Sequence, residues 1–171
     1  MNQIAVSSLS ALVHALDDAV LAPPGLRAAA AAEALRPFLD RADLLQDHAC
    51  PCSAERYARH ALHVDPHGRY CLVAIVWRPG QESPIHAHKT WCAFGIHRGA
   101  LVESFFAVPD AEHPEFRDAV VRRCGAISCG EADPCAAHRV TNTGVATAVS
   151  LHVYGVAFDD YGTGVSAVLA A

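Results

Sequence analysis

The sequence of 171 residues has no excess of positive charge and no long apolar run. Its formal net charge is −5, which speaks against a nucleic-acid partner because such a surface needs a basic face. Apolar runs such as Ala28–Ala32 and Cys71–Trp77 are too short to cross a bilayer. Met1–Gln3 lacks the basic segment that opens a signal peptide. We therefore expect a cytoplasmic protein with neither membrane nor nucleic acid as a partner.

The seven cysteines also lack a regular framework, and their number is odd. Reduced thiols in a cytosol fit this better than a secreted disulfide scaffold does. Cys50 and Cys52 could be half of a zinc site, but no second closely spaced pair follows, so we favour loop thiols. Internal repeats and linkers are absent as well. The length suits one domain, residues 1–171, with a single core.

Two helical segments precede a series of short strands. Residues 4–20 place apolar side chains at helical spacing, Pro23–Gly25 ends that pattern, and Leu26–Phe38 is rich in alanine with a bend or stop at Pro37. We expect a helical cap over residues 1–45. Turn residues then separate predicted strands at Tyr57–Val64, Arg69–Trp77, Cys92–His97, Ala100–Ala107, Ala119–Ser128, Ala136–Thr141 and Ala146–Tyr154. Strands at this density favour a mainly β barrel or sandwich over residues 55–171.

Two histidines at i and i+2, His86 and His88, would share one face of a strand. Such a pair alone is weak evidence for a metal site, because a polar strand face produces it too. Its surroundings add weight. The first cupin motif is matched at every spacing, with a cysteine in its glutamate position, by Gly80, His86, His88, Cys92 and Gly99. The sequence thus favours a cupin, a small β-barrel or jelly roll with N-terminal helices.

A third histidine, His138, begins the H-x3-N end of the second cupin motif, and Asn142 completes it. The earlier part of that motif aligns poorly, because Cys135 stands in its glycine position and Pro134 is one position off. The similarity to cupins implies that this histidine faces the first pair across the barrel.

The cysteine at position 92 removes the carboxylate that most iron cupins use as a ligand. Three neutral imidazoles, His86, His88 and His138, would leave iron(II) its full positive charge. That charge suits an anionic ligand such as a thiolate, whose pKa the metal lowers. Three facial ligands also leave open positions for substrate sulfur, substrate nitrogen and dioxygen. Fe²⁺ is therefore the expected cofactor.

From Tyr57 to about Phe158 the sequence resembles the cysteine dioxygenase family of thiol dioxygenases. Three segments carry the similarity: Ser83–Trp91, with the bacterial HxHxTW signature; His138–Asn142; and Ser150–Tyr154, which matches the family's Ser-His-Tyr triad. In the family this triad lies beside the iron, and its tyrosine hydroxyl points at the substrate.

The triad is also reasonable from the residues alone. Ser150, His152 and Tyr154 alternate along a strand and so share a face, where their side chains could hydrogen-bond in series. The alternative is a solvent-facing strand with Leu151 and Val153 in the core.

Arg59 lies in a further matching segment, Tyr57–Arg59. The resemblance implies that Arg59, with Tyr57 beside it, binds the substrate carboxylate, and a guanidinium suits that role because its planar fork donates two hydrogen bonds. Related 3-mercaptopropionate dioxygenases usually have glutamine there, yet they often carry the TW signature that this sequence shares. A surface arginine on an edge strand is the alternative interpretation.

Animal cysteine dioxygenases join a cysteine to the triad tyrosine through a thioether, and Cys92 lies one residue closer to the histidine pair than that cysteine. At i+4 from His88 on a regular strand, Cys92 would share the face of the ligands. This suggests a Cys92–Tyr154 thioether, with a small apolar filler as the alternative.

The sequence predicts an iron(II)-dependent thiol dioxygenase that converts L-cysteine and dioxygen to the sulfinate. In the alternatives that stay open, the substrate is 3-mercaptopropionate, mercaptosuccinate or another thiol acid, or the protein is a cupin that only binds a metal or ligand. An isomerase is a weaker option, because such cupins generally keep the carboxylate ligand that Cys92 replaces. We expect the partners to be a small thiol and dioxygen, and the chain to be a monomer.

Overall fold

The computed structural model describes residues 7–109 and 113–169. The N-terminal helical elements are α1 (Ser8–Ala19), α2 (Arg27–Leu35) and the 3-10 turn Arg36–Phe38. The strands that follow are β1 (Ala58–Val64), β2 (Cys71–Trp77), β3 (His86–His88), β4 (Cys92–Arg98), β5 (Ala100–Ala107), β6 (Glu115–Arg123), β7 (Ile127–Gly130), β8 (Asp133–Thr141) and β9 (Ala148–Tyr154). The last elements are a 3-10 turn (Phe158–Asp160), α3 (Tyr161–Gly164) and β10 (Ser166–Val168).

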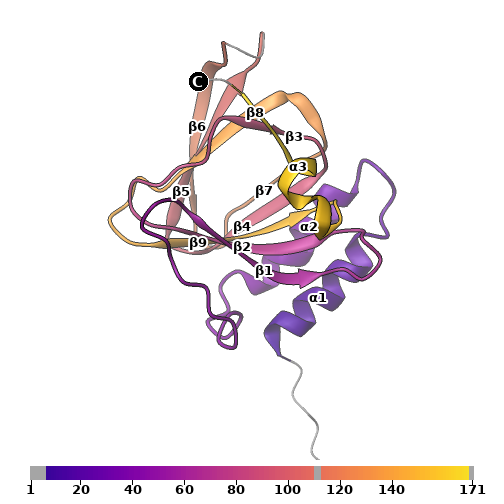
Figure 1. The fold of residues 1–171 in the computed structure, drawn as a ribbon. Coiled ribbons are helices and arrows are strands. Elements are labelled where there is room, and N and C mark those ends of the chain that lie inside the picture. Colours follow the sequence, from indigo (N-terminus) through magenta and orange to yellow (C-terminus); the bar gives the residue numbers. More distant parts are fainter. Residues whose placement is uncertain (1–6, 110–112, 170–171) are drawn as a thin grey trace, which may run out of the picture.

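Two antiparallel five-stranded sheets face each other and form the barrel (Figure 1). The first sheet has the order β1-β2-β9-β4-β7, and the second has the order β10-β3-β8-β5-β6. Apart from the consecutive pairs β1–β2 and β5–β6, the neighbours in each sheet are distant in the sequence, so the chain passes repeatedly from one sheet to the other. The predicted mainly β barrel with N-terminal helices is confirmed.

The central strands of the first sheet are buried on both faces, and their sequence explains why. All residues of β2 and β9 are buried. Alternate residues such as Leu72, Leu151 and Val153 pack outward against α1 and α2, in one apolar cluster with Leu12 and Leu35. The intervening residues point into the barrel. Figure 1 shows both helices against this outer face, away from the second sheet.

The helices form where the sequence pattern predicts them. Ser7 caps α1 by accepting a hydrogen bond from the backbone N–H of Ser10, and Leu9, Leu12 and Leu16 form its buried stripe. The predicted start at residue 4 lies outside the described residues. No helix in the described part of the chain is long and apolar enough to cross a membrane.

One predicted strand, Ala119–Ser128, is wrong. β6 ends at Arg123, and Gly125 turns the chain with φ 83° before β7 begins at Ile127. Glycine adopts that left-handed conformation without the steric cost that other residues incur, so a turn forms inside what reads as one strand-like run. The turn takes the chain from β6, at the edge of the second sheet, to β7, at the edge of the first sheet beside β4.

Candidate metal centre and reaction cavity

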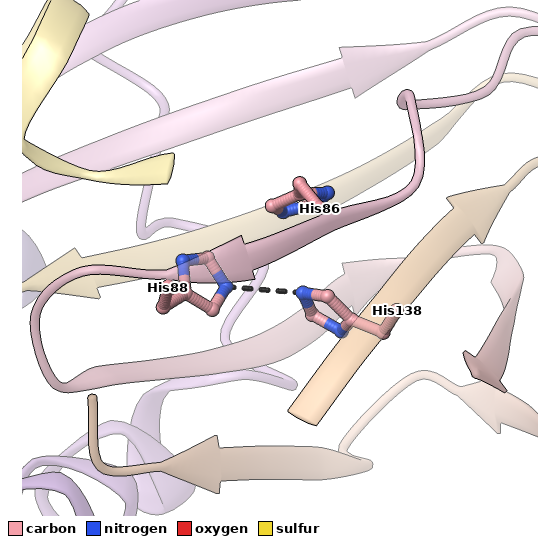
Figure 2. Close-up of side chains that lie close together, drawn as sticks. All are labelled: His86, His88 and His138. Atoms are coloured by element: carbon pink, nitrogen blue, oxygen red, sulfur yellow. Dashed lines mark hydrogen bonds between the residues drawn. The ribbon is translucent and has the colours of Figure 1, made fainter. Parts of the chain in front are cut away.

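Three histidine side chains from neighbouring strands converge inside the barrel (Figure 2). His86 and His88 project from β3, and His138 projects from β8, directly opposite His86 in the antiparallel register. One ring nitrogen of each lies within 4.8 Å of the others. Nε2 of His88 and Nε2 of His138 are 3.0 Å apart. The structure thus brings together the three ligands expected from the sequence.

The hydrogen bonds of these rings determine which nitrogen is available to a metal. His86 Nδ1 lies 3.0 Å from the carbonyl oxygen of Pro84, and His138 Nδ1 lies 2.9 Å from a carboxylate oxygen of Glu103. Both partners accept, so each Nδ1 carries the proton and each Nε2 keeps its lone pair. Nε2 atoms as close as those of His88 and His138 require a proton or a cation between them. The cluster therefore fits a divalent transition metal.

Burial keeps the imidazoles of His86 and His88 neutral, which is the form that binds a metal. Desolvation, reinforced by the neighbouring imidazoles, lowers the pKa of His86 to about 4 and that of His88 to about 3. Neither ring is protonated near neutral pH, so a metal would not compete with protons for these two sites.

Glu103, on β5, is a functional residue that the sequence analysis missed. It is 1% exposed, and one carboxylate oxygen accepts hydrogen bonds from His138 Nδ1 and, at 3.1 Å, from Ser128 Oγ. The other oxygen accepts from Arg122, whose Nε and Nη2 lie at 2.9 and 2.8 Å. Burial raises the pKa of Glu103, but the bonds from His138 and Arg122 outweigh it and hold this pKa below its usual value.

A signal for Glu103 was present in the sequence. It alternates with Leu101 and Phe105 on β5, so it had to enter the core, and a buried carboxylate needs partners. A carboxylate behind a ligating histidine fixes the tautomer and the orientation of the ring.

Strand β9, in the sheet opposite the three histidines, carries the Ser-His-Tyr triad. Ser150 Oγ lies 2.8 Å from His152 Nε2, and Tyr154 Oη lies 3.0 Å from His152 Nδ1. All three side chains are buried, which contradicts the alternative of a solvent-facing strand. Desolvation holds the pKa of His152 well below, and that of Tyr154 well above, its usual value. The imidazole is therefore neutral and the phenol protonated at neutral pH.

Trp77 extends this chain of hydrogen bonds, although it was not among the residues predicted from the sequence. Its indole Nε1–H donates to Ser150 Oγ at 2.9 Å. An indole can only donate, which favours a chain in which Ser150 donates to His152 Nε2 and His152 Nδ1–H donates to Tyr154. The Tyr154 hydroxyl proton is then free to point toward a ligand in the cavity.

The Thr-Trp part of the HxHxTW signature ties the histidine strand to the end of β9. Thr90 Oγ1 donates to the carbonyl of Gly155 at 2.7 Å, and the Gly155 N–H donates to the Trp91 carbonyl at 3.0 Å. A Cβ on Gly155 would lie 2.0 Å from Trp91 Nε1, so only glycine permits this approach. The contact positions Tyr154, one residue before Gly155, near His88, and the two ring centroids are 5.8 Å apart.

Arg59 lies at the mouth of the site, on the edge strand β1. Its Nη2 donates to Tyr57 Oη at 2.7 Å, and its guanidinium carbon lies 5.0 and 5.6 Å from the ring centroids of Tyr57 and Tyr161. Two aromatic faces thus hold the cation. It is exposed, and no carboxylate in the described segments pairs with it. A carboxylate on a ligand could take that place.

A cavity of about 130 Å³, the first cavity, collects these groups. Its lining includes Tyr57, Arg59, Trp77, His86, His88, His138, His152, Tyr154 and Tyr161. Of the residues expected at the site, Ser150 and Cys92 do not line this cavity. Ser150 instead hydrogen-bonds to His152, which does line it.

Cys92 reaches the barrel interior by a different route from the expected one. It does not continue the strand of the histidines, because the chain leaves the second sheet after His88 and enters the first sheet at Cys92. The expected i+4 alternation along one strand is therefore wrong. The register of β4 and β9 nevertheless sets Cys92 directly opposite Tyr154, and both side chains belong to the apolar cluster inside the barrel.

The fold and the histidine cluster together define a cupin whose interior is suited to a metal. Solved structures agree on the fold. A Klebsiella pneumoniae protein with a double-stranded β-helix domain matches with a TM-score of 0.53 and 16% identity, covering 74% of this chain and 95% of its own. Oxalate decarboxylase from Lactobacillus farciminis matches with a TM-score of 0.52 and 15% identity, covering 72% of this chain and 34% of its own.

Sequence comparison gives the family. The family model for cysteine dioxygenase type I matches residues 48–162, and the chain belongs to that family. Human cysteine dioxygenase type 1 is 33% identical over 111 residues, which cover 61% of this chain and 53% of the human protein. The protein from Bos taurus is 32% identical over the same shares. The chain spans about half the length of the curated relatives it matches.

Proposed function

We propose that this protein is an iron(II)-dependent dioxygenase that oxidises the thiol of a small carboxylic acid to a sulfinate, with L-cysteine as the expected substrate. In this reaction both atoms of dioxygen become bonded to the thiol sulfur, and one proton is released. One observation carries the proposal: the histidine cluster, the Tyr154 hydroxyl and the Arg59 guanidinium line one cavity. Family membership supports it.

Each group in the first cavity has a distinct part. His86, His88 and His138 would hold iron, which supplies the redox chemistry that dioxygen requires and that zinc lacks. Arg59 would pair with the substrate carboxylate, with the Tyr57 hydroxyl beside it. No aspartate or glutamate lines this cavity, so nothing in its wall repels an anionic ligand.

Tyr154 would orient the reacting groups. Its phenol keeps its proton at neutral pH, because burial raises its pKa. The hydrogen bond from His152 fixes the hydroxyl oxygen, so its proton can be donated to substrate or dioxygen in the cavity. The chain from Trp77 through Ser150 to His152 would keep this orientation during turnover.

We also propose that the protein works in the cytoplasm and as one domain. All seven cysteines are free, which suits a reducing compartment. The helices at residues 8–35 share an apolar cluster with β2 and β9, which supports folding as one unit. The expected monomer stays a prediction.

The proposal is tested by loading the metal-free protein anaerobically with Fe²⁺ or Zn²⁺ and then supplying dioxygen. L-Cysteine, 3-mercaptopropionate and mercaptosuccinate are compared by oxygen uptake and by mass spectrometry of the product. We expect the iron form alone to consume dioxygen and to yield a sulfinate. Equal activity with zinc, or no thiol oxidation with iron, would contradict the proposal, and much faster turnover of 3-mercaptopropionate would change the substrate.

A further inference from the structure

A second cavity, of about 110 Å³, meets the same histidines from elsewhere in the barrel. It shares His88 and His138 with the first cavity and no other lining residue. The rings of these two histidines therefore form a partition between two spaces. A group in the second cavity can reach the metal centre without passing Arg59 or Tyr154.

The inner part of the second cavity offers little to water or to a polar ligand. Cys92, Phe94 and Phe105 supply apolar surface. Glu103 also lines it, but both of its oxygens already accept hydrogen bonds from His138, Arg122 and Ser128. An ordered water needs two to four polar partners, so this part of the cavity favours small apolar occupants.

The outer part of the second cavity differs in charge from the mouth of the first. It carries two exposed carboxylates, Glu131 and Asp133, and no lysine or arginine. The first cavity carries Arg59 and no acidic residue. A thiol carboxylate is attracted to the first opening and repelled by the second, whereas a neutral apolar gas is indifferent to either charge.

We propose that the second cavity is a passage through which dioxygen reaches the histidine centre, separate from the opening that admits the thiol acid. The inference rests on the proposed dioxygenase function. A substrate held by Arg59 and the metal would fill much of the first cavity, and the second cavity would still admit dioxygen. Dioxygen partitions favourably into a dry apolar space, so the cavity would also concentrate it beside His88 and His138.

Gly130 on β7 provides a way to close this passage. It lines the second cavity and lies directly opposite Cys92 in the β4–β7 register. A Cβ built on Gly130 meets no atom within 4 Å, and its φ is not in the left-handed region, so a larger side chain adds bulk without strain. Gly162 has the same properties but lines the first cavity, so it is the matched control.

The test compares steady-state kinetics of Gly130→Leu and Gly162→Leu after iron loading, with dioxygen and thiol varied separately. We expect Gly130→Leu to raise KM for dioxygen several-fold and to leave KM for the thiol unchanged. Gly162→Leu should raise KM for the thiol and leave KM for dioxygen unchanged. Metal content and melting temperature establish that each variant is folded and loaded.

Xenon provides a readout that needs neither metal nor turnover, because it binds in dry apolar cavities. Crystals of the metal-free protein under xenon pressure should show xenon in the second cavity, and Gly130→Leu should remove it. An active wild type whose dioxygen KM is unaffected by Gly130→Leu, or one that takes up no xenon there, overturns the passage and leaves the proposed function intact. A wild type that oxidises no thiol overturns the proposed function and, with it, the role of dioxygen.

Discussion

The three histidines lie on the second sheet, whereas Ser150, His152 and Tyr154 lie on the first sheet, across the barrel. These three histidines form the histidine wall, which is oriented by a charged network in which Glu103 joins His138 to Arg122. The tyrosine wall is oriented only by neutral groups in series, from Trp77 to Tyr154. Both networks are buried, but the first ends in imidazole nitrogens at the cavity and the second ends in a hydroxyl group.

One network is charged and the other neutral because they orient groups with different roles. A histidine binds a metal cation through the lone pair of one ring nitrogen. A carboxylate that accepts a hydrogen bond from the other ring nitrogen makes that lone pair more basic. Tyr154 is expected to donate its hydroxyl proton to a ligand. A neutral group that donates a hydrogen bond to the hydroxyl oxygen leaves that proton available. Variants of the histidine wall should therefore change metal content, and variants of the tyrosine wall should change turnover alone.

His138→Ala should have the largest effect on this comparison. It removes one of three ligands and one of the hydrogen-bond donors to Glu103, so we expect iron to fall from about one per chain to almost none. Metal analysis of the purified, iron-loaded protein measures this. His67→Ala, in an exposed turn, is the control and should keep its iron. Full iron content in His138→Ala would remove this residue from the site.

Tyr154→Phe should keep its iron and lose turnover. Only the hydroxyl is removed, so we expect kcat to fall by about 100-fold, within the usual range for a positioned proton donor. Tyr70→Phe is a matched control, because Tyr70 is also buried but bonds to Asp17 and Val13 beside α1. If Tyr154→Phe also lost its iron, the two walls would not be independent.

Glu103→Gln keeps the shape of the side chain and removes its charge. We expect metal affinity to fall by about 10–100-fold, as is typical when a hydrogen-bond partner of a ligating histidine is changed. Competition with a chelator measures the affinity. Glu82→Gln removes a carboxylate that bonds to Thr141 and Arg139 near the surface, and it should leave the affinity unchanged. Equal affinities in all three proteins would contradict a role for Glu103.

Arg59→Ala should act on substrate binding and on neither wall. Because Arg59 is exposed, the loss of its charged hydrogen bond is worth about 1.5 kcal/mol, and KM for the thiol acid should rise roughly tenfold. Cysteamine, which lacks the carboxylate, should be insensitive to the change. Arg56→Ala, an exposed neighbour that does not line the first cavity, is the control. An unchanged KM for L-cysteine would exclude this role.

The smallest change is the thioether predicted between Cys92 and Tyr154. A bond would form between the sulfur and a ring carbon, dioxygen would take up one hydrogen from the thiol and one from the ring to give hydrogen peroxide, and the intact mass would fall by those two hydrogens after turnover. Cys92→Ser should show no loss. Cys71 also lies opposite Tyr154, on the other neighbouring strand, so Cys71→Ser should keep the loss if Cys92 is the partner. A loss that disappears only in Cys71→Ser would assign the crosslink to Cys71.

Much of the site was predictable because its elements are local. Alternation placed His86 with His88, and Ser150 with His152 and Tyr154, since residues two apart on a strand share a face. The helices were predictable from their apolar spacing. The strand predicted over residues 119–128 was wrong because its strand-like residues on both sides hide a turn that depends on the one glycine within it, Gly125.

By itself the sequence determined a mainly β fold with N-terminal helices and which side chains share a strand face, because strand alternation and helix periodicity act over a few residues. The match to the first cupin motif specified the cupin fold. Only the tertiary structure decided which of these faces meet. Glu103 reaches His138 across 35 positions, and Trp77 reaches Ser150 across 73, because of the register of strands that are distant in the chain. That register also divides the interior into two cavities at His88 and His138. It results from the packing of two whole sheets, which no local pattern encodes.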